Sequence, residues 1–232
     1  MRHVIIDTQT RKRINEVDPL KKIEMENLEN LKNSPMDPPD AYSVKNDNIT
    51  GVLHPLVHRL TVEGEIINQQ IADFENNCNE LWKKSQIGSQ ELSETFGVFF
   101  RFYDQYLLVS FQNKVRYLYP VIHEKLLDSG EHSKEEYPKT AIDLFEDDYI
   151  KTIQLGSLIF NFLGLRNHLK DPVTQNIITD SAFRSAKELI EILKLHFFRE
   201  SNVLVEMISK MFSSDELDAI YLRLNKAEPP SM

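Results

Sequence analysis

Cysteine and glycine are scarce in this chain of 232 residues. The single cysteine, Cys78, excludes an intramolecular disulfide, and the seven glycines form no phosphate-binding loop. There is no secretory signal pattern, and no apolar run approaches the ~18 residues that a membrane span needs. We therefore expect a cytoplasmic protein that does not enter the membrane.

Basic residues are outnumbered by acidic ones, and strand patterns are scarce. Lys and Arg number 27 against 36 Asp and Glu, which gives a net charge of −9. Nucleic acid and anionic membranes are thus unexpected partners, because both attract clustered positive charge. Alternating apolar and polar residues are nearly absent, so the predicted fold class is all-α. No Ser-His-Asp order, CxxC pair or HExxH motif is present, and we expect binding rather than catalysis.

The chain divides into an extension, one main domain and a tail. Residues 1–50 form the N-terminal extension, with a short strand-like segment, a helical pattern over 11–33 and a proline-rich linker. This extension is a candidate contact for a protein partner or a second subunit. The main domain covers residues 51–225, and residues 226–232 form a tail that we expect to be disordered.

Four long amphipathic segments fill the main domain. Their predicted bounds are His54-Pro55 to Lys84, Gln90 to Leu127 with a break, Thr140 to Leu165, and Asp180 to Phe212. Asp180 or Ser181 is the expected N-cap of the fourth segment, and Ser213 with Glu216 predicts a capping box for a short last helix. Segments of this length joined by short loops predict an up-down four-helix bundle.

The fourth segment carries two polar residues on an apolar stripe. His196 and Glu200 lie one helical turn apart. The remainder of the stripe consists of Leu189, Leu193, Val203 and Met207. The same periodicity turns further polar side chains inward from the second and third segments. We expect a core polar cluster of Ser110, Lys114, Asp148, His196 and Glu200.

The second and fourth segments also resemble each other. The sequence from Leu107 aligns without gaps with the sequence from Leu193, so that Ser110 stands against His196 and Lys114 against Glu200. This match indicates an internal duplication, with the first two helices repeated as the last two.

Several of these residues form a pattern known from one family. The second segment contains Leu118-Tyr119-Pro120, the fourth contains His196 and Glu200 followed by Val203-Leu204, and the first begins HPLVHRLTVEGEII. In these features residues 51–225 resemble the hemerythrin-like, or HHE cation-binding, family. Its members usually hold a non-haem di-iron centre between four helices. The resemblance implies a metal cofactor and a role in oxygen or nitric oxide sensing, iron handling or repair of damaged iron centres.

The chain departs from this family at most of the ligand positions. The ligands of the first three helices fall at Gly64, at Ser110 and Lys114, and at Asp148; only His196 and Glu200 remain. A di-iron site needs about five to seven His and carboxylate ligands. We therefore expect a degenerate centre.

Three hypotheses describe that centre. In the first, the Lys114 ammonium replaces the metal and neutralises Asp148 and Glu200. In the second, one iron, zinc or manganese ion is bound by Asp148, His196 and Glu200, joined by His54 at the start of the first helix or, less favourably, by the solvent-facing His58. In the third, His196 is an ordinary buried, hydrogen-bonded histidine in an unrelated bundle. For the function, a metal-free protein-interaction module is the alternative to sensing or metal handling.

Overall fold

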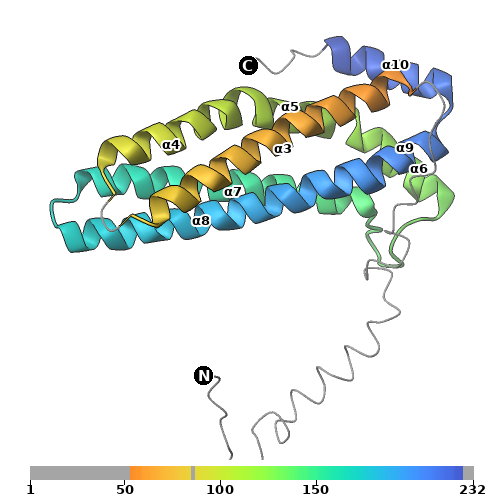
Figure 1. The fold of residues 1–232 in the computed structure, drawn as a ribbon. Helices are drawn as coiled ribbons and strands as arrows, with labels where there is room; N and C mark the ends of the chain where they lie inside the picture. The colour runs from red at the N-terminus through yellow and green to blue at the C-terminus, as the bar shows by residue number, and fades with distance from the viewer. Residues whose placement is uncertain (1–52, 85–86, 227–232) are drawn as a thin grey trace, which may run out of the picture. The chain divides into compact units, whose positions relative to one another are not determined.

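The computed structural model describes residues 53–84 and 87–226, and every regular element in these residues is helical (Figure 1). None of these helices is both long and apolar enough to cross a bilayer. The predictions for residues 1–50 and for the tail after Lys226 lie outside the described residues.

The first helical run is α3, Pro55–Trp82. Its start agrees with the prediction: Pro55 occupies the first turn, and the Nδ1 atom of the His54 N-cap accepts a hydrogen bond from the Leu56 amide at 3.1 Å. The second run is interrupted twice. It consists of α4 (Ser89–Phe102), a π-helical turn η2 (Tyr103–Leu107), α5 (Leu108–Tyr117) and α6 (Tyr119–Ser129).

The third run is α7 (Ala141–His168). The fourth consists of α8 (Pro172–Arg199), a second π-helical turn η3 (Glu200–Leu204) and α9 (Val205–Met211), and a short separate helix, α10 (Ser214–Lys226), follows it. The predicted capping box before the last helix is present, with Glu216 accepting from the Ser213 amide at 2.8 Å.

The predicted start of the fourth segment is wrong. Helix α8 begins at Pro172, and its N-cap is Asp171, whose side chain accepts from the Thr174 amide at 2.8 Å. Asp180 and Ser181 lie inside the helix, where the Ser181 hydroxyl donates to the Ile177 carbonyl at 3.0 Å. The Asp171-Pro172 pair is itself a helix-start signal, because aspartate caps the amides and proline suits the first turn.

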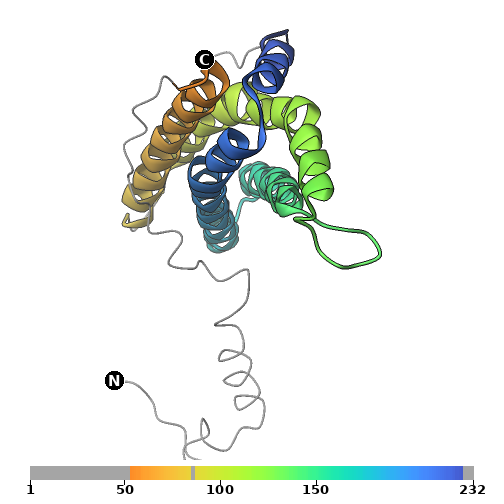
Figure 2. The same ribbon diagram turned by 90° about the vertical axis from the view of Figure 1, so that its right-hand side faces the viewer.

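The four runs lie side by side and alternate in direction (Figures 1 and 2). Helices α7 and α8 form a hairpin, α3 lies against α4 and α8, and α10 packs on α3 and α5.

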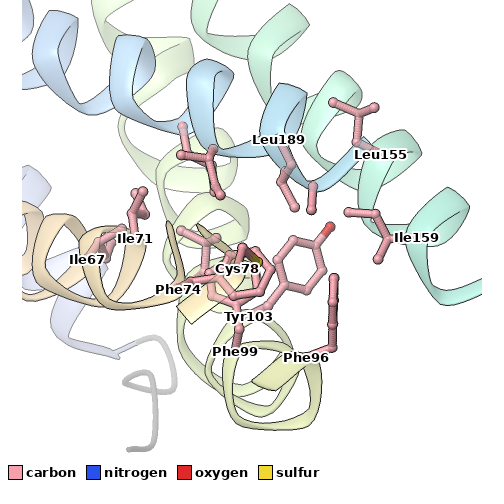
Figure 3. Packing of buried hydrophobic residues seen from close by; sticks show 14 of the residues in the cluster. Ile67, Ile71, Phe74, Cys78, Phe96, Phe99, Tyr103, Leu155, Ile159 and Leu189 are labelled. Carbon is pink, nitrogen blue, oxygen red and sulfur yellow. The ribbon is translucent and has the colours of Figure 1, made fainter. Parts of the chain in front are cut away.

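The buried apolar residues form two clusters along these runs. The first, part of which is seen in Figure 3, includes Ile67 and Phe74 of α3, Phe111 of α5 and Phe197 of α8. The second includes Leu60 of α3, Leu118, Phe145 of α7 and Leu204 of η3. On each run the two clusters are separated by a few residues. The buried carboxylates and Lys114 lie in or beside these gaps, whereas the buried Arg166 lies near the end of α7.

Candidate functional site

A layer of buried polar side chains lies between the two apolar clusters. Each member is at most 7% exposed, and every helical run contributes at least one; we call Glu63, Ser110, Lys114, Asp148, His196 and Glu200 the polar layer. Five of these six are the residues that helical periodicity turned inward. Glu63 is the addition.

Lys114 lies at the centre of the layer. Its Nζ atom is 2.6 Å from Glu200 Oε1 and 2.9 Å from Glu63 Oε1. The Ser110 hydroxyl donates to the same Glu63 oxygen. The ammonium also lies 5.3 Å from the centroid of the Phe197 ring, close enough for a cation–π contact. One lysine therefore joins carboxylates from α3 and η3 through α5.

Ion pairing outweighs burial for the two central charges. Burial lowers the pKa of Lys114. Attraction to Glu200 and Glu63, together with the hydrogen bonds to them, raises the pKa by more than burial lowers it, so the pKa lies above its ordinary value. Burial raises the pKa of Glu200, but Lys114 and His196 lower it by more, and the net pKa is below its ordinary value. Both groups are therefore held in their charged forms at neutral pH.

His196 occupies an aromatic enclosure beside this pair. The centroid of its ring lies 4.6 Å from that of Phe111, 5.2 Å from that of Phe145 and 5.0 Å from that of Phe197. Its Nδ1 atom is 3.4 Å from Asp148 Oδ2 and its Nε2 atom 3.6 Å from Glu200 Oε2. These distances allow electrostatic attraction, but neither ring nitrogen forms a hydrogen bond.

A second cation neutralises Asp148 from the edge of the layer. Arg199 donates from Nη1 to Asp148 Oδ2 at 2.9 Å, and its side chain is 30% exposed. The three carboxylates of the layer thus face Lys114 and His196 within it and Arg199 at its edge. With His196 neutral the sum is one negative charge, and with His196 protonated it is zero.

Some buried polar atoms in and next to the layer have no hydrogen-bond partner. They are both ring nitrogens of His196, Glu200 Oε2, Tyr119 Oη and Thr152 Oγ1. Burial, together with the charges of Glu200, Glu63 and Asp148, raises the pKa of Tyr119 well above its ordinary value. An unpaired buried polar group costs about 1–3 kcal/mol. The ion pairs of the layer have to offset this cost.

The layer as arranged does not fit a metal ion. In the part of the chain that the structure describes, no group of three or more His, Cys, Asp or Glu side chains is placed to hold one. Lys114 itself lies between the two glutamates, and the two His196 nitrogens face different carboxylates.

The candidate fourth ligand, His54, is not brought to the layer. Its Nδ1 atom caps α3, and its Nε2 atom lies 3.3 Å from Asp218 of α10. His58 is exposed, as the helical pattern predicted.

Two residues of the site escaped the sequence analysis. Glu63 was overlooked in favour of its neighbour Gly64, although both are buried. Its signal was present, because Glu63 lies three residues after Leu60 and four before Ile67, on the inner face of the same helix. Arg199 had no such signal, since its partner Asp148 comes from another helix.

The π-helical turn η3 explains a shift in the fourth segment. The stripe was predicted to continue through Val203 and Met207, but these are half-buried, whereas Leu204 and Ile208 are fully buried. A π turn accommodates one extra residue, so every later position moves by one. Because η3 begins at Glu200, the turn leaves His196 and Glu200 in place.

The second run shows the same shift at the matching place. The stripe that includes Ser110 and Lys114 would continue at helical spacing to Tyr117 and Val121, but Leu118 and Ile122 are fully buried instead. The regular helix resumes at Tyr119 in one run and at Val205 in the other, and these two residues are partners in the ungapped alignment. Both runs are therefore irregular at this place, the fourth through a π turn and the second through a break at Leu118, whereas the π turn η2 of the second run aligns with regular helix in α8.

No protein-family model matches this chain, and comparisons with curated proteins and with solved structures also return no match. The function has to be argued from the residues of the polar layer and the surface.

Proposed function

We propose that this protein is a divergent four-helix bundle of the hemerythrin-like kind that acts by binding another protein, with an ionic layer centred on Lys114 in the place of a metal. The observation that carries the proposal is the position of the Lys114 ammonium, 2.6 Å from Glu200 and 2.9 Å from Glu63. A divalent metal would need those same carboxylate oxygens.

The chemistry of the layer supports a lysine in this role. An ammonium supplies a compact positive charge with three donors, and it can satisfy two carboxylates and pack on a ring. Leaving either glutamate buried without a cation would cost several kcal/mol. Lys114 thereby holds together carboxylates that come from different helices, a role that a metal plays in metal-centred bundles.

The interior offers little to a catalytic mechanism. General acids and bases work best with pKa values near the working pH. Here burial and the charge of Glu75 raise the pKa of the Cys78 thiol to about 12, and the pKa of Tyr119 lies well above its ordinary value. The pKa of Lys114 is raised and that of Glu200 is lowered, so both are shifted away from neutral pH. These properties favour binding over turnover.

Metal analysis tests the proposal directly. The full chain is purified without chelators from cells supplied with iron, zinc and manganese, and its metal content and unfolding temperature are measured. We expect far less than one metal per chain and no change in unfolding temperature when a chelator or any of the three metals is added. One or two metals per chain, lost to a chelator together with stability, would overturn the proposal in favour of a metal centre.

A lysine substitution provides the second arm. Lys114→Glu places a carboxylate between Glu63 and Glu200, and we expect the variant to need a divalent cation for stability. Lys187→Glu is the matched control, because the Lys187 side chain is 77% exposed and lies outside the layer. Equal metal dependence of the two variants would show that Lys114 does not occupy a cation position.

A further inference from the structure

Helix α7 is apolar on two opposite sides. One side packs inward through residues such as Leu155 and Ile159. On the other side Ile150, Ile153 and Phe160 are 51%, 38% and 70% exposed. A surface helix normally has one apolar face. When a helix is apolar on opposite faces, both faces are normally packed against other protein elements.

The exposed residues form a straight strip. Ile150, Ile153, Ser157, Phe160 and Gly164 follow one another at spacings of three and four, which places them on one face of the helix. Glu146 precedes this strip by four residues and His168 follows it by four; both are exposed. From residue 146 to 168 the strip extends over about 33 Å at 1.5 Å per residue.

The strip is complementary to itself in the antiparallel direction. If two copies of α7 cross head to tail with Ser157 on the two-fold axis, Ile150 of one faces Gly164 of the other, and Glu146 faces His168. The large Ile150 then meets the small Gly164, Ile153 of each copy lies beside Phe160 of the other in an apolar contact, and the acidic Glu146 meets His168. The small Ser157 side chains at the centre let the two backbones approach.

We propose that this face of α7 binds the same face of a second copy, giving a two-fold symmetric dimer. The interface lies on the outer surface of α7 and includes none of the polar layer. A failure of the metal test therefore leaves the dimer standing, and a failure of the dimer test leaves the ionic core standing.

Sedimentation of the full chain over a range of concentrations tests the dimer. We expect dimers at concentrations of about 100 μM, where a dissociation constant of ~10 μM would be exceeded. Phe160→Glu should raise that constant at least about a hundredfold, because it places two carboxylates in an apolar contact. Leu222→Glu, at a position 59% exposed on α10, should leave it unchanged. Circular dichroism checks that both variants fold.

Two further variants test the register. Ser157→Cys should crosslink the dimer through a disulfide or a short bifunctional maleimide, whereas Ser209→Cys, exposed on α9, should not; the single native thiol, Cys78, is buried. Glu146→Lys and His168→Glu should each weaken the dimer, and the two together should restore it. A monomer at every concentration, or a dimer that Phe160→Glu leaves intact, would overturn the proposal.

Discussion

Two buried cations among the described residues, Lys114 and Arg166, are stabilised in opposite ways. Lys114 lies in the middle of the runs and contacts two carboxylates, Glu63 and Glu200. Arg166, near the end of α7, is equally hidden at 6% exposure, yet within residues 53–84 and 87–226 it has no ion pair. It donates instead to Thr179 Oγ1 at 2.9 Å, Ser89 Oγ at 2.7 Å and the Ile87 carbonyl at 3.1 Å.

The contrast follows from the two side chains. A guanidinium spreads its charge over a plane and is weakly hydrated, so neutral oxygens arranged around its fork can satisfy it. An ammonium is compact and strongly hydrated, and in a dry interior it needs anions nearby. Arg166 therefore ties α7 to α8 and to the start of α4 by geometry, whereas Lys114 joins its helices by charge.

The largest effect is expected at Lys114. Lys114→Met leaves Glu63 and Glu200 buried without their cation and should lower the free energy of unfolding by about 3–5 kcal/mol. Urea denaturation measures this. Changing Glu63 and Glu200 to Gln in the same chain should recover much of the loss, because the repelling charges are gone. A triple variant no more stable than Lys114→Met would show that packing, not charge, sets the cost.

Stability should depend on pH at both extremes because of the same layer. The pKa of Glu200 is lowered in the folded protein, so its contribution is present above its ordinary pKa of about 4.3 and is lost as pH falls through the folded value. The pKa of Lys114 is raised, so its contribution is present below about 10.4 and is lost as pH rises through the folded value.

Denaturation from about pH 3 to 11 follows the onset of both losses, because each begins near the ordinary pKa of its group. In the Lys114→Met variant with both glutamates changed to Gln, the acid and alkaline losses should shrink. An unchanged profile would exclude the layer as their source.

A smaller loss is expected at Arg166. Arg166→Met removes three hydrogen bonds to neutral oxygens but strands no anion, so the cost should be about 1–3 kcal/mol. Urea denaturation alongside Lys114→Met gives the comparison. A cost at Arg166 equal to or above that at Lys114 would break the distinction between the two buried cations.

The smallest effect is expected at a surface pair. Lys194 and Glu75 also join α8 to α3, but their side chains are 47% and 37% exposed. Lys194→Ala should cost no more than about 1 kcal/mol, and high salt should abolish the difference. The cost of Lys114→Met should persist in salt, since its partners are buried. Equal salt sensitivity would contradict this.

Sequence patterns predicted the helical class, the extent of the first helix and the inward direction of Ser110, Lys114, Asp148, His196 and Glu200. These predictions follow from local periodicity, which depends only on the sequence of one helix and not on its neighbours. The bounds of α8 were missed although Asp171 and Pro172 signalled them. The inward shift to Leu204 and Ile208 could not be predicted, because the apolar pattern before a π turn does not show where the turn will occur. The contact of Arg199 with Asp148 depends on how two helices are placed, which no local pattern encodes.

The polar layer also fixes how the helices are aligned along their length. Apolar side chains tolerate sliding, because one leucine can replace another in the same contact. Lys114 has no such substitute. Moving α5 by one helical turn, about 5.4 Å, would carry its ammonium into an apolar cluster and leave Glu63 and Glu200 buried without their cation. The ion pairs of the layer thus fix the positions of α3, α5 and the run of α8 and η3 along their axes, because any other alignment leaves buried charges without a partner.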